Sequence, residues 1–162
     1  MEKHTISLYV SNIPGILVRI SLVFARRGYN IDSLVVSAAH DPAFSRMTIV
    51  ATGEKNTLDQ ILKQLNKLID VVEAKDETGE EVVHREMALV KIRCSDETRS
   101  EVLQLANAFK GDVVDIGDTT ITFMTTGKTP KMEAINSVFD KYGVMEVVRS
   151  GKLLIARGDH VI

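Results

Sequence analysis

In the first half of the chain, the spacing of hydrophobic residues alternates between every second residue, as in a strand, and the three-to-four-residue spacing of a helix. Residues Ile6–Val10 alternate apolar and polar side chains, which predicts a half-buried strand. Apolar residues then recur at helical spacing from Ile16 to Phe24, and Gly28 stands where a helix commonly ends. The short β-branched run 30–38 predicts a second strand, which ends at a turn around His40–Pro42.

The first half of the chain continues with a third strand, a second helix and a fourth strand. Residues Arg46–Thr52 form an apolar, β-branched run that Gly53 ends. An amphipathic stripe from Leu58 to Ile69 predicts a helix, and Val71–Lys75 predicts a final strand. The predicted order is β-α-β-β-α-β, which is the ferredoxin-like unit.

The second half repeats the plan with different residues. Its predicted elements are a strand through Cys94, a helix that Lys110–Gly111 ends, a hairpin turning at Gly117–Asp118, a helix that Thr129 caps and Pro130 begins, and strands at 144–149 and 153–156. We therefore expect an α+β protein with two ferredoxin-like βαββαβ domains in tandem. The polar segment between the halves predicts domains at residues 1–76 and 86–162, joined by a linker at 77–85.

Composition excludes several classes of protein. The chain has 162 residues, 44% hydrophobic and 26% charged, with a net charge of −2, so no basic field points to nucleic acid or to an anionic membrane. No apolar run approaches the roughly 20 residues of a membrane helix, and the first residues do not read as a signal peptide. The one cysteine, Cys94, rules out an intrachain disulfide and suits the reducing cytoplasm, where we expect the protein.

The junction between the first strand and the first helix carries the main candidate site. It contains a glycine, and free backbone N–H groups at a helix N-terminus are a seat for a carboxylate. The side-chain amides of Asn12 and Asn30 offer further donors and acceptors. On spacing alone, ligand binding and a simple capped turn remain equally open. The second junction, Arg93–Glu97, is acidic and lacks glycine, so it should not bind in the same way.

No residue of the chain stands in a pattern typical of catalysis or metal binding. Cys94 ends an alternating strand, which indicates a core residue rather than a nucleophile. The pattern favours solvated positions without ligand-like spacing for the remaining candidates: His4, His40, His84 and His160, and the linker carboxylates Glu77, Glu80 and Glu81. The cations Arg19, Arg26 and Arg27 fall on the polar face of the first helix, where exposed charges explain them and a role in partner binding stays open.

Other ferredoxin-like proteins lack support in this sequence. An RNA-recognition module carries aromatic residues on its third strand, which here is Met47–Val50. A soft-metal carrier needs a cysteine pair in the first loop, and a small acyl-phosphate hydrolase needs an arginine there. The loop has neither residue type.

Several segments together resemble the small regulatory subunit of bacterial acetolactate synthase (acetohydroxyacid synthase), and the resemblance covers essentially the whole chain. An Asn-x-x-Gly loop alone is shared by many ACT domains, so the combination carries the resemblance. The segments are Asn12–Ile20, Arg27–Leu34, Ser45–Thr48, Arg85–Ile92, Val148–Gly151 and Ala156–Asp159.

The resemblance implies an N-terminal ACT domain, which dimerises and binds the effector, followed by a second ferredoxin-like domain. It implies a subunit without an active site, which activates a separate catalytic large subunit holding thiamine diphosphate, magnesium and FAD. It also implies feedback inhibition by valine or a related branched-chain amino acid, bound where two ACT domains pair. By that resemblance the effector site comprises Asn12, Ile13, Pro14, Gly15, Ile16 and Leu17 of one copy and Asn30 and Ile31 of the other.

This regulatory subunit of branched-chain amino acid biosynthesis is the leading interpretation. Two alternatives remain at this point: a stand-alone amino-acid-sensing ACT protein with a different partner, and a small ferredoxin-like acyl-phosphate hydrolase. Copurification with a thiamine-diphosphate enzyme would distinguish the first interpretation from the second, and the missing loop arginine counts against the third.

Overall fold

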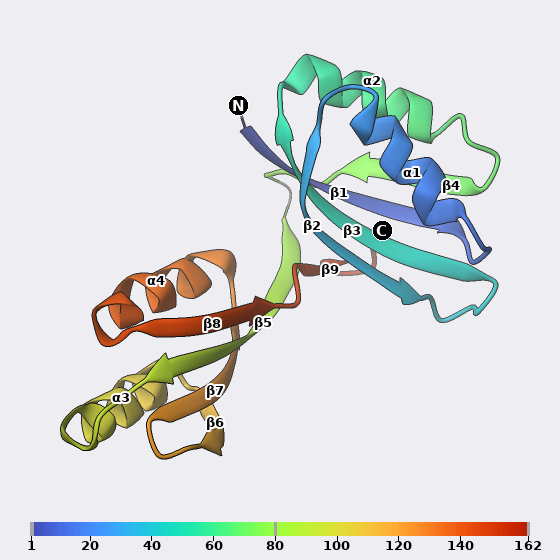
Figure 1. The fold of residues 1–162 in the computed structure, drawn as a ribbon. Coiled ribbons are helices and arrows are strands. Elements are labelled where there is room, and N and C mark those ends of the chain that lie inside the picture. The colour runs from blue at the N-terminus through green and yellow to red at the C-terminus, as the bar shows by residue number, and fades with distance from the viewer. Residues whose placement is uncertain (1, 80, 162) are drawn as a thin grey trace. The chain divides into compact units, whose positions relative to one another are not determined.

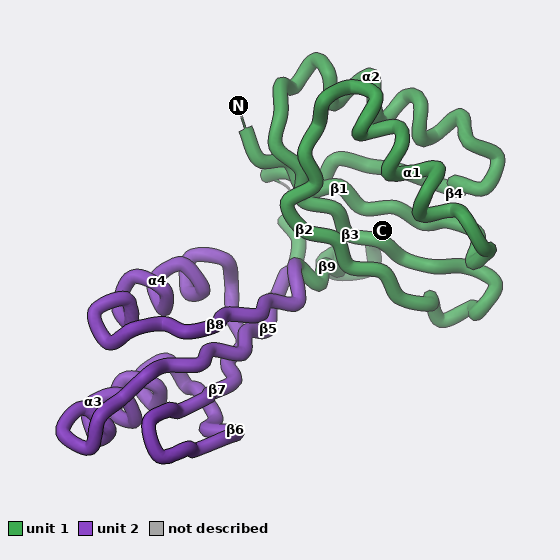
Figure 2. The backbone as a smooth tube through the Cα atoms, in the orientation of Figure 1, with its two compact units in different colours: residues 1–83, 152–162 green, residues 84–151 purple. Residues whose placement is uncertain are grey.

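The computed structural model describes residues 2–79 and 81–161, which fold into two compact units (Figures 1 and 2). The first unit contains the residues up to Val83 together with those from Lys152 onward, and the second is His84–Gly151. The C-terminal residues therefore belong with the first half of the chain, which the sequence pattern does not reveal.

The first unit is a four-stranded antiparallel sheet in the order β2-β3-β1-β4, with two helices on one face (Figure 1). Its core lies between the sheet and the helices, because Ile6, Leu8 and Val10 on the central strand are buried there. The elements are β1 (Glu2–Ser11), α1 (Ile16–Ala25), β2 (Asn30–Ala38), β3 (Phe44–Gly53), α2 (Lys55–Leu65) and β4 (Val71–Asp76).

The second unit has the same order of strands and helices, with strand order β6-β7-β5-β8, and β9 pairs with β5 outside that path. Ala88, Val90 and Ile92 of its central strand pack into a separate core, together with Phe123 and Phe139. The elements are β5 (Val82–Arg93), α3 (Asp96–Ala108), β6 (Asp112–Ile116), β7 (Thr120–Gly127), α4 (Thr129–Phe139), a 3-10 turn (Asp140–Tyr142) and β8 (Val144–Arg149). Strand β9 (Leu153–Ala156) follows in the part of the chain that belongs to the first unit. Two ferredoxin-like folds in tandem are thus confirmed.

Helix α2 ends at Leu65 and not at Ile69 as expected, because Ile69 is exposed. Three expectations about polar residues are also wrong. Thr129 does not cap α4: it is the first helical residue, and the N-cap position is Lys128. The Thr129 hydroxyl donates instead to the buried carboxylate of Glu86. Glu77 is not a solvated linker residue: it is 3% exposed and accepts a hydrogen bond of 2.9 Å from the Ser7 hydroxyl. In each case a partner distant in sequence decides the environment.

The third wrong expectation concerns His4, which is not solvated but only 1% exposed. Its position on β1 alternates with Ile6, so its ring faces the helices, 6.4 Å from the ring of Tyr29. Neither ring nitrogen has a hydrogen-bond partner among the described residues. Of the other candidates, Cys94 is buried as expected and His40 and His160 are exposed, whereas Glu80 lies outside the described residues.

We predict that His4→Leu stabilises the protein. An unpaired buried polar group carries a desolvation cost of about 1–3 kcal/mol, which an apolar side chain of similar reach removes. Urea unfolding should therefore show a free energy of unfolding higher by about that amount. The matched control, His160→Leu at an exposed position, should leave it unchanged, and a destabilised His4→Leu protein would show that the ring has a partner after all.

Candidate functional site

The turn from β1 into α1 depends on the backbone of Gly15. Gly15 has φ 84° and ψ −5°, a left-handed conformation that costs a side-chain-bearing residue about 1–2 kcal/mol. A Cβ built at this position would meet no atom within 4 Å, so the glycine is required here by conformation rather than by crowding within the chain. This conformation turns the loop that follows β1 into the first helical residue, Ile16.

The N-terminus of α1 has no cap. No side chain accepts from its N–H groups and its first turn contains no acidic residue. Arg19 is the first residue whose N–H reaches back to Gly15, so the N–H groups of Leu17 and Val18 have no backbone acceptor within the described part of the chain. Free N–H groups at the positive end of a helix dipole are suited to an anion such as a carboxylate.

Asn12 lies beside this helix end and is held in place by the loop that follows β2. Its backbone N–H donates to the carbonyl of Ala43 at 2.8 Å, and its side-chain Nδ2 donates to the carbonyl of Pro42 at 3.0 Å. The side-chain oxygen has no partner among the described residues. Asn12 therefore presents an acceptor, and the helix end beside it presents donors.

The remaining loop residues form an apolar and largely exposed surface. Ile16 is buried in the core, whereas Ile13 and Leu17 are 39% and 40% exposed, and Pro14 is exposed too. The loop is thus an open half-site: polar groups suited to an amino acid's charged end, flanked by apolar side chains that nothing in the described chain covers.

Asn30 and Ile31 lie at the first residues of β2. The Asn30 amide donates to Asp32 at 2.8 Å, and Asp32 also accepts from the Thr52 hydroxyl on the neighbouring strand. The hydrogen bond from Thr52 lowers the pKa of the Asp32 carboxyl, and the bond from Asn30 adds to the effect. Ile31 packs, half-buried, against the core. Sequence reasoning did not find Asp32, although its place two residues after Asn30 was a signal.

The structure does not bring Asn30 and Asn12 together within one chain. Asn30 pairs with Thr52 at one end of β3, while Ala38, at the other end of β2, pairs with Ser45 beside Val10. Eight residues of strand at about 3.4 Å each separate these ends by about 27 Å. The residues assigned to one site therefore occupy two places in a single copy.

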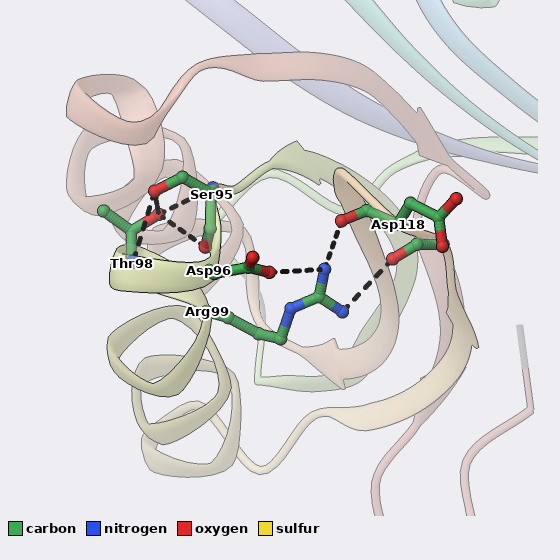
Figure 3. A network of polar contacts seen from close by, with 6 residues as sticks. Ser95, Asp96, Thr98, Arg99 and Asp118 are labelled. Carbon is green, nitrogen blue, oxygen red and sulfur yellow. Dashed lines mark hydrogen bonds and ion pairs between the residues drawn. The ribbon is translucent and has the colours of Figure 1, made fainter.

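The corresponding junction of the second unit is closed by its own side chains (Figure 3). The Ser95 hydroxyl accepts from the Thr98 N–H while the Thr98 side chain accepts from the Ser95 N–H. This capping box satisfies the Thr98 N–H, whose counterpart in α1, the N–H of Val18, is left free. Asp96 and Arg99 add an ion pair in the same turn, and Arg99 also donates to the carbonyl of Gly117. Of the two junctions, the first alone is open to an anion.

Helix α1 has two flanks with different character. On the flank toward α2, Arg19 pairs with Asp70 and Arg27 donates to Gln64. At about 100° per residue, Leu17 lies about 160° from Arg19 around α1 and projects from the opposite flank, above the edge strand β2, whereas Val18 projects away from the sheet. The two residues are 40% and 61% exposed, so Leu17 adds exposed apolar surface beside the strand edge.

The part of the chain that the structure describes contains no group of three or more His, Cys, Asp or Glu side chains able to hold a metal ion. Among the described helices, none has the length and apolar character needed to cross a bilayer.

Comparison with known proteins gives the same assignment for both halves. Residues 6–73 match the family model for the AHAS small subunit-like ACT domain, and residues 85–158 match the model for the small subunit of acetolactate synthase. The acetolactate synthase small subunit of Mycolicibacterium smegmatis is 42% identical over 155 residues, which span 96% of this chain and 91% of the relative. The probable acetolactate synthase small subunit of Methanothermobacter thermautotrophicus is 38% identical over 162 residues, 99% of this chain and 96% of the relative.

A solved structure extends the likeness to the fold. The crystal structure of the acetolactate synthase small subunit from Thermotoga maritima superposes with a TM-score of 0.85 at 34% identity, over 99% of this chain and 100% of that one. Sequence and fold agree over nearly the whole length. The chain belongs to the family of acetolactate synthase small subunits.

Proposed function

We propose that this chain is a non-catalytic regulatory subunit that binds valine or a related branched-chain amino acid and controls an acetolactate synthase large subunit. In this proposal the large subunit carries thiamine diphosphate, magnesium and FAD, and the complex works in the cytoplasm. The proposal that the chain binds an amino acid rests on one observation: the N-terminus of α1 has no side-chain cap and lies beside the free side-chain oxygen of Asn12. Family membership supports the partner.

The geometry suggests how the two charged groups of an amino acid divide between the donors and the acceptor. The carboxylate would accept from the N–H groups of Leu17 and Val18, and the ammonium would donate to the side-chain oxygen of Asn12. The branched apolar side chain would then lie against Ile13 and Leu17, whose exposed surface it covers. The site thus selects an amino acid with an apolar side chain.

A homodimer formed through the edge strand β2 would complete this site. If two β2 strands pair antiparallel about a two-fold axis near Leu34, Asn30 of one copy faces the Ala38 end of the other. That end leads into the loop whose Pro42 carbonyl holds Asn12. Asn30 and Ile31 of the second copy would then lie beside the half-site of the first, although about 27 Å of strand separates the two places in one chain.

Two properties of the first unit favour this pairing. An edge strand of nine residues leaves its outer N–H and C=O groups without partners, and pairing with a second copy satisfies them. Leu17, which is 40% exposed, lies above that edge and would be covered by the other copy. In the proposal the first unit is therefore the dimerising and effector-binding unit, and the second unit is needed only for the full valine response.

A ligand bound between two copies can regulate without chemistry of its own. Its contacts differ between alternative arrangements of the two copies, so it shifts the equilibrium toward the arrangement that it binds better. The large subunit would respond to that arrangement. No acid, base or nucleophile is required of this chain.

The loop variants Asn12→Ala and Gly15→Ala should separate valine sensing from activation. Losing a hydrogen bond to a charged ligand group should weaken valine binding by about 1.5–3 kcal/mol, or roughly 10- to 150-fold. Gly15→Ala should do at least as much, because its φ of 84° strains any residue with a Cβ and so distorts the helix end. Calorimetric titration with valine, leucine and isoleucine measures the loss, and the variants should still activate the large subunit.

Ser95→Ala is the matched control for these variants. It removes the cap of the corresponding helix in the second unit and should cost about 1 kcal/mol of stability. Valine affinity should remain that of the unaltered chain. If Asn12→Ala and Gly15→Ala bind valine as tightly as Ser95→Ala does, the first junction is only a turn and the effector binds elsewhere.

Activity measurements test whether the chain is non-catalytic and controls a catalytic large subunit. The purified chain alone should form no acetolactate from pyruvate, and adding it to the purified large subunit should raise turnover and make it sensitive to valine. Sustained synthesis by the chain alone, with contamination excluded by a mock purification, would contradict the assignment.

A further inference from the structure

A second surface of the first unit, on the α2 side of α1, has no role in the proposed function. It is a groove of about 380 Å³ between α1 and the C-terminal end of α2. Leu22, Val23 and Leu68 provide its apolar part. Arg19, Arg26 and Lys67 provide its charged part, and all three are exposed.

The groove carries an excess of positive charge. Arg19 is neutralised by its ion pair with Asp70. Arg26 and Lys67 have no side-chain partner among the described residues, and Lys67 follows α2 directly beyond its last turn. Two uncompensated cations next to exposed apolar surface are notable in a chain whose net charge is −2. The complementary ligand is both acidic and apolar.

This groove is separate from the proposed effector and dimer surfaces. Arg26 lies nine residues after Leu17, which at about 100° per residue places the two side chains about 180° apart around α1. Leu17 faces the β2 side, and Arg26 faces the α2 side. A partner in the groove can therefore bind while two copies are paired through β2.

We propose that the groove docks an acidic amphipathic segment of the large subunit, with its apolar side chains against Leu22 and Leu68 and its carboxylates against Arg26 and Lys67. This inference rests on the proposed function, because it names the part of this chain that the partner contacts. A segment that presents carboxylates beside apolar side chains matches the groove in both respects, as helix-in-groove recognition requires. The exposed charges would contribute mainly to the association rate and to partner choice.

A small anion or a nucleic acid fits the groove less well. A bare phosphate could pair with Arg26 and Lys67, but it would make no use of the apolar side chains of Leu22 and Leu68. A nucleic acid needs a broad field of positive charge, and the net charge of −2 opposes it. The apolar residues of the groove would remain uncovered in both cases.

The test is the affinity of the full-length chain for the purified large subunit of the same organism, measured by fluorescence anisotropy. Arg26→Glu and Lys67→Glu should each weaken binding at least tenfold, and the salt dependence of the affinity should become shallower. Lys63→Glu is the matched control: it makes the same change of charge on α2, at an exposed residue that does not line the groove. It should bind within twofold of the unaltered chain.

Valine titration and the oligomeric state of each variant show whether the substitutions act only on the groove. Both should be unchanged, because the groove lies opposite the proposed effector flank. Equal losses for Arg26→Glu and Lys63→Glu, or no loss for either groove variant, would overturn the proposal. So would a shift of the chain's own oligomeric state in Arg26→Glu, or saturable binding of inorganic phosphate that this variant abolishes.

If the unaltered chain does not bind the large subunit at all, the proposed function itself fails. If the unaltered chain binds and activates the large subunit while the groove variants bind equally well, only the docking site is wrong.

Discussion

The left-handed backbone at Gly15 is the constraint on which the functional interpretation depends. It turns the loop that follows β1 into α1, and no side chain of that loop bonds to the helix N–H groups. The N–H groups of Leu17 and Val18 remain free, whereas in the second unit the hydroxyl of Ser95 accepts from the Thr98 N–H, the counterpart of Val18. The same fold is thus present twice, and one difference at a helix start makes one copy a candidate receptor and leaves the other as a scaffold.

The ferredoxin-like order of strands explains why such a receptor would need a second copy. Asn12 and Asn30 lie at opposite ends of one sheet, so no rearrangement that preserves the sheet can join them in a single chain. A two-fold axis on the edge strand brings unlike ends together, because antiparallel pairing reverses one strand relative to the other. Ligand binding and dimer geometry would then be one equilibrium, and a subunit without catalytic groups could control another protein through it.

Most elements could be predicted from the sequence, because the apolar residues of each strand or helix recur with the period of that element on the face that packs into the core. Ile6, Leu8 and Val10 are an example. What periodicity cannot show is the partner of a polar residue. His4 occupies a core-facing position of β1. Glu77 is buried and accepts a hydrogen bond from Ser7, and Thr129 donates to Glu86 instead of capping α4. The loop of the candidate site was visible as a glycine between a strand and a helix, but the placement of Asn12 by Pro42 and of Asn30 by Asp32 depends on contacts between strands.

The most direct measurement uses mixed dimers. A chain carrying Asn12→Ala and a chain carrying Asn30→Ala should each bind valine weakly as homodimers. A heterodimer of the two, isolated with two different affinity tags, contains one site with both substitutions and one site with neither. Calorimetry of this heterodimer should recover one valine site per dimer with the affinity of the unaltered protein. A heterodimer that binds as weakly as its parents would contradict a site shared between two copies.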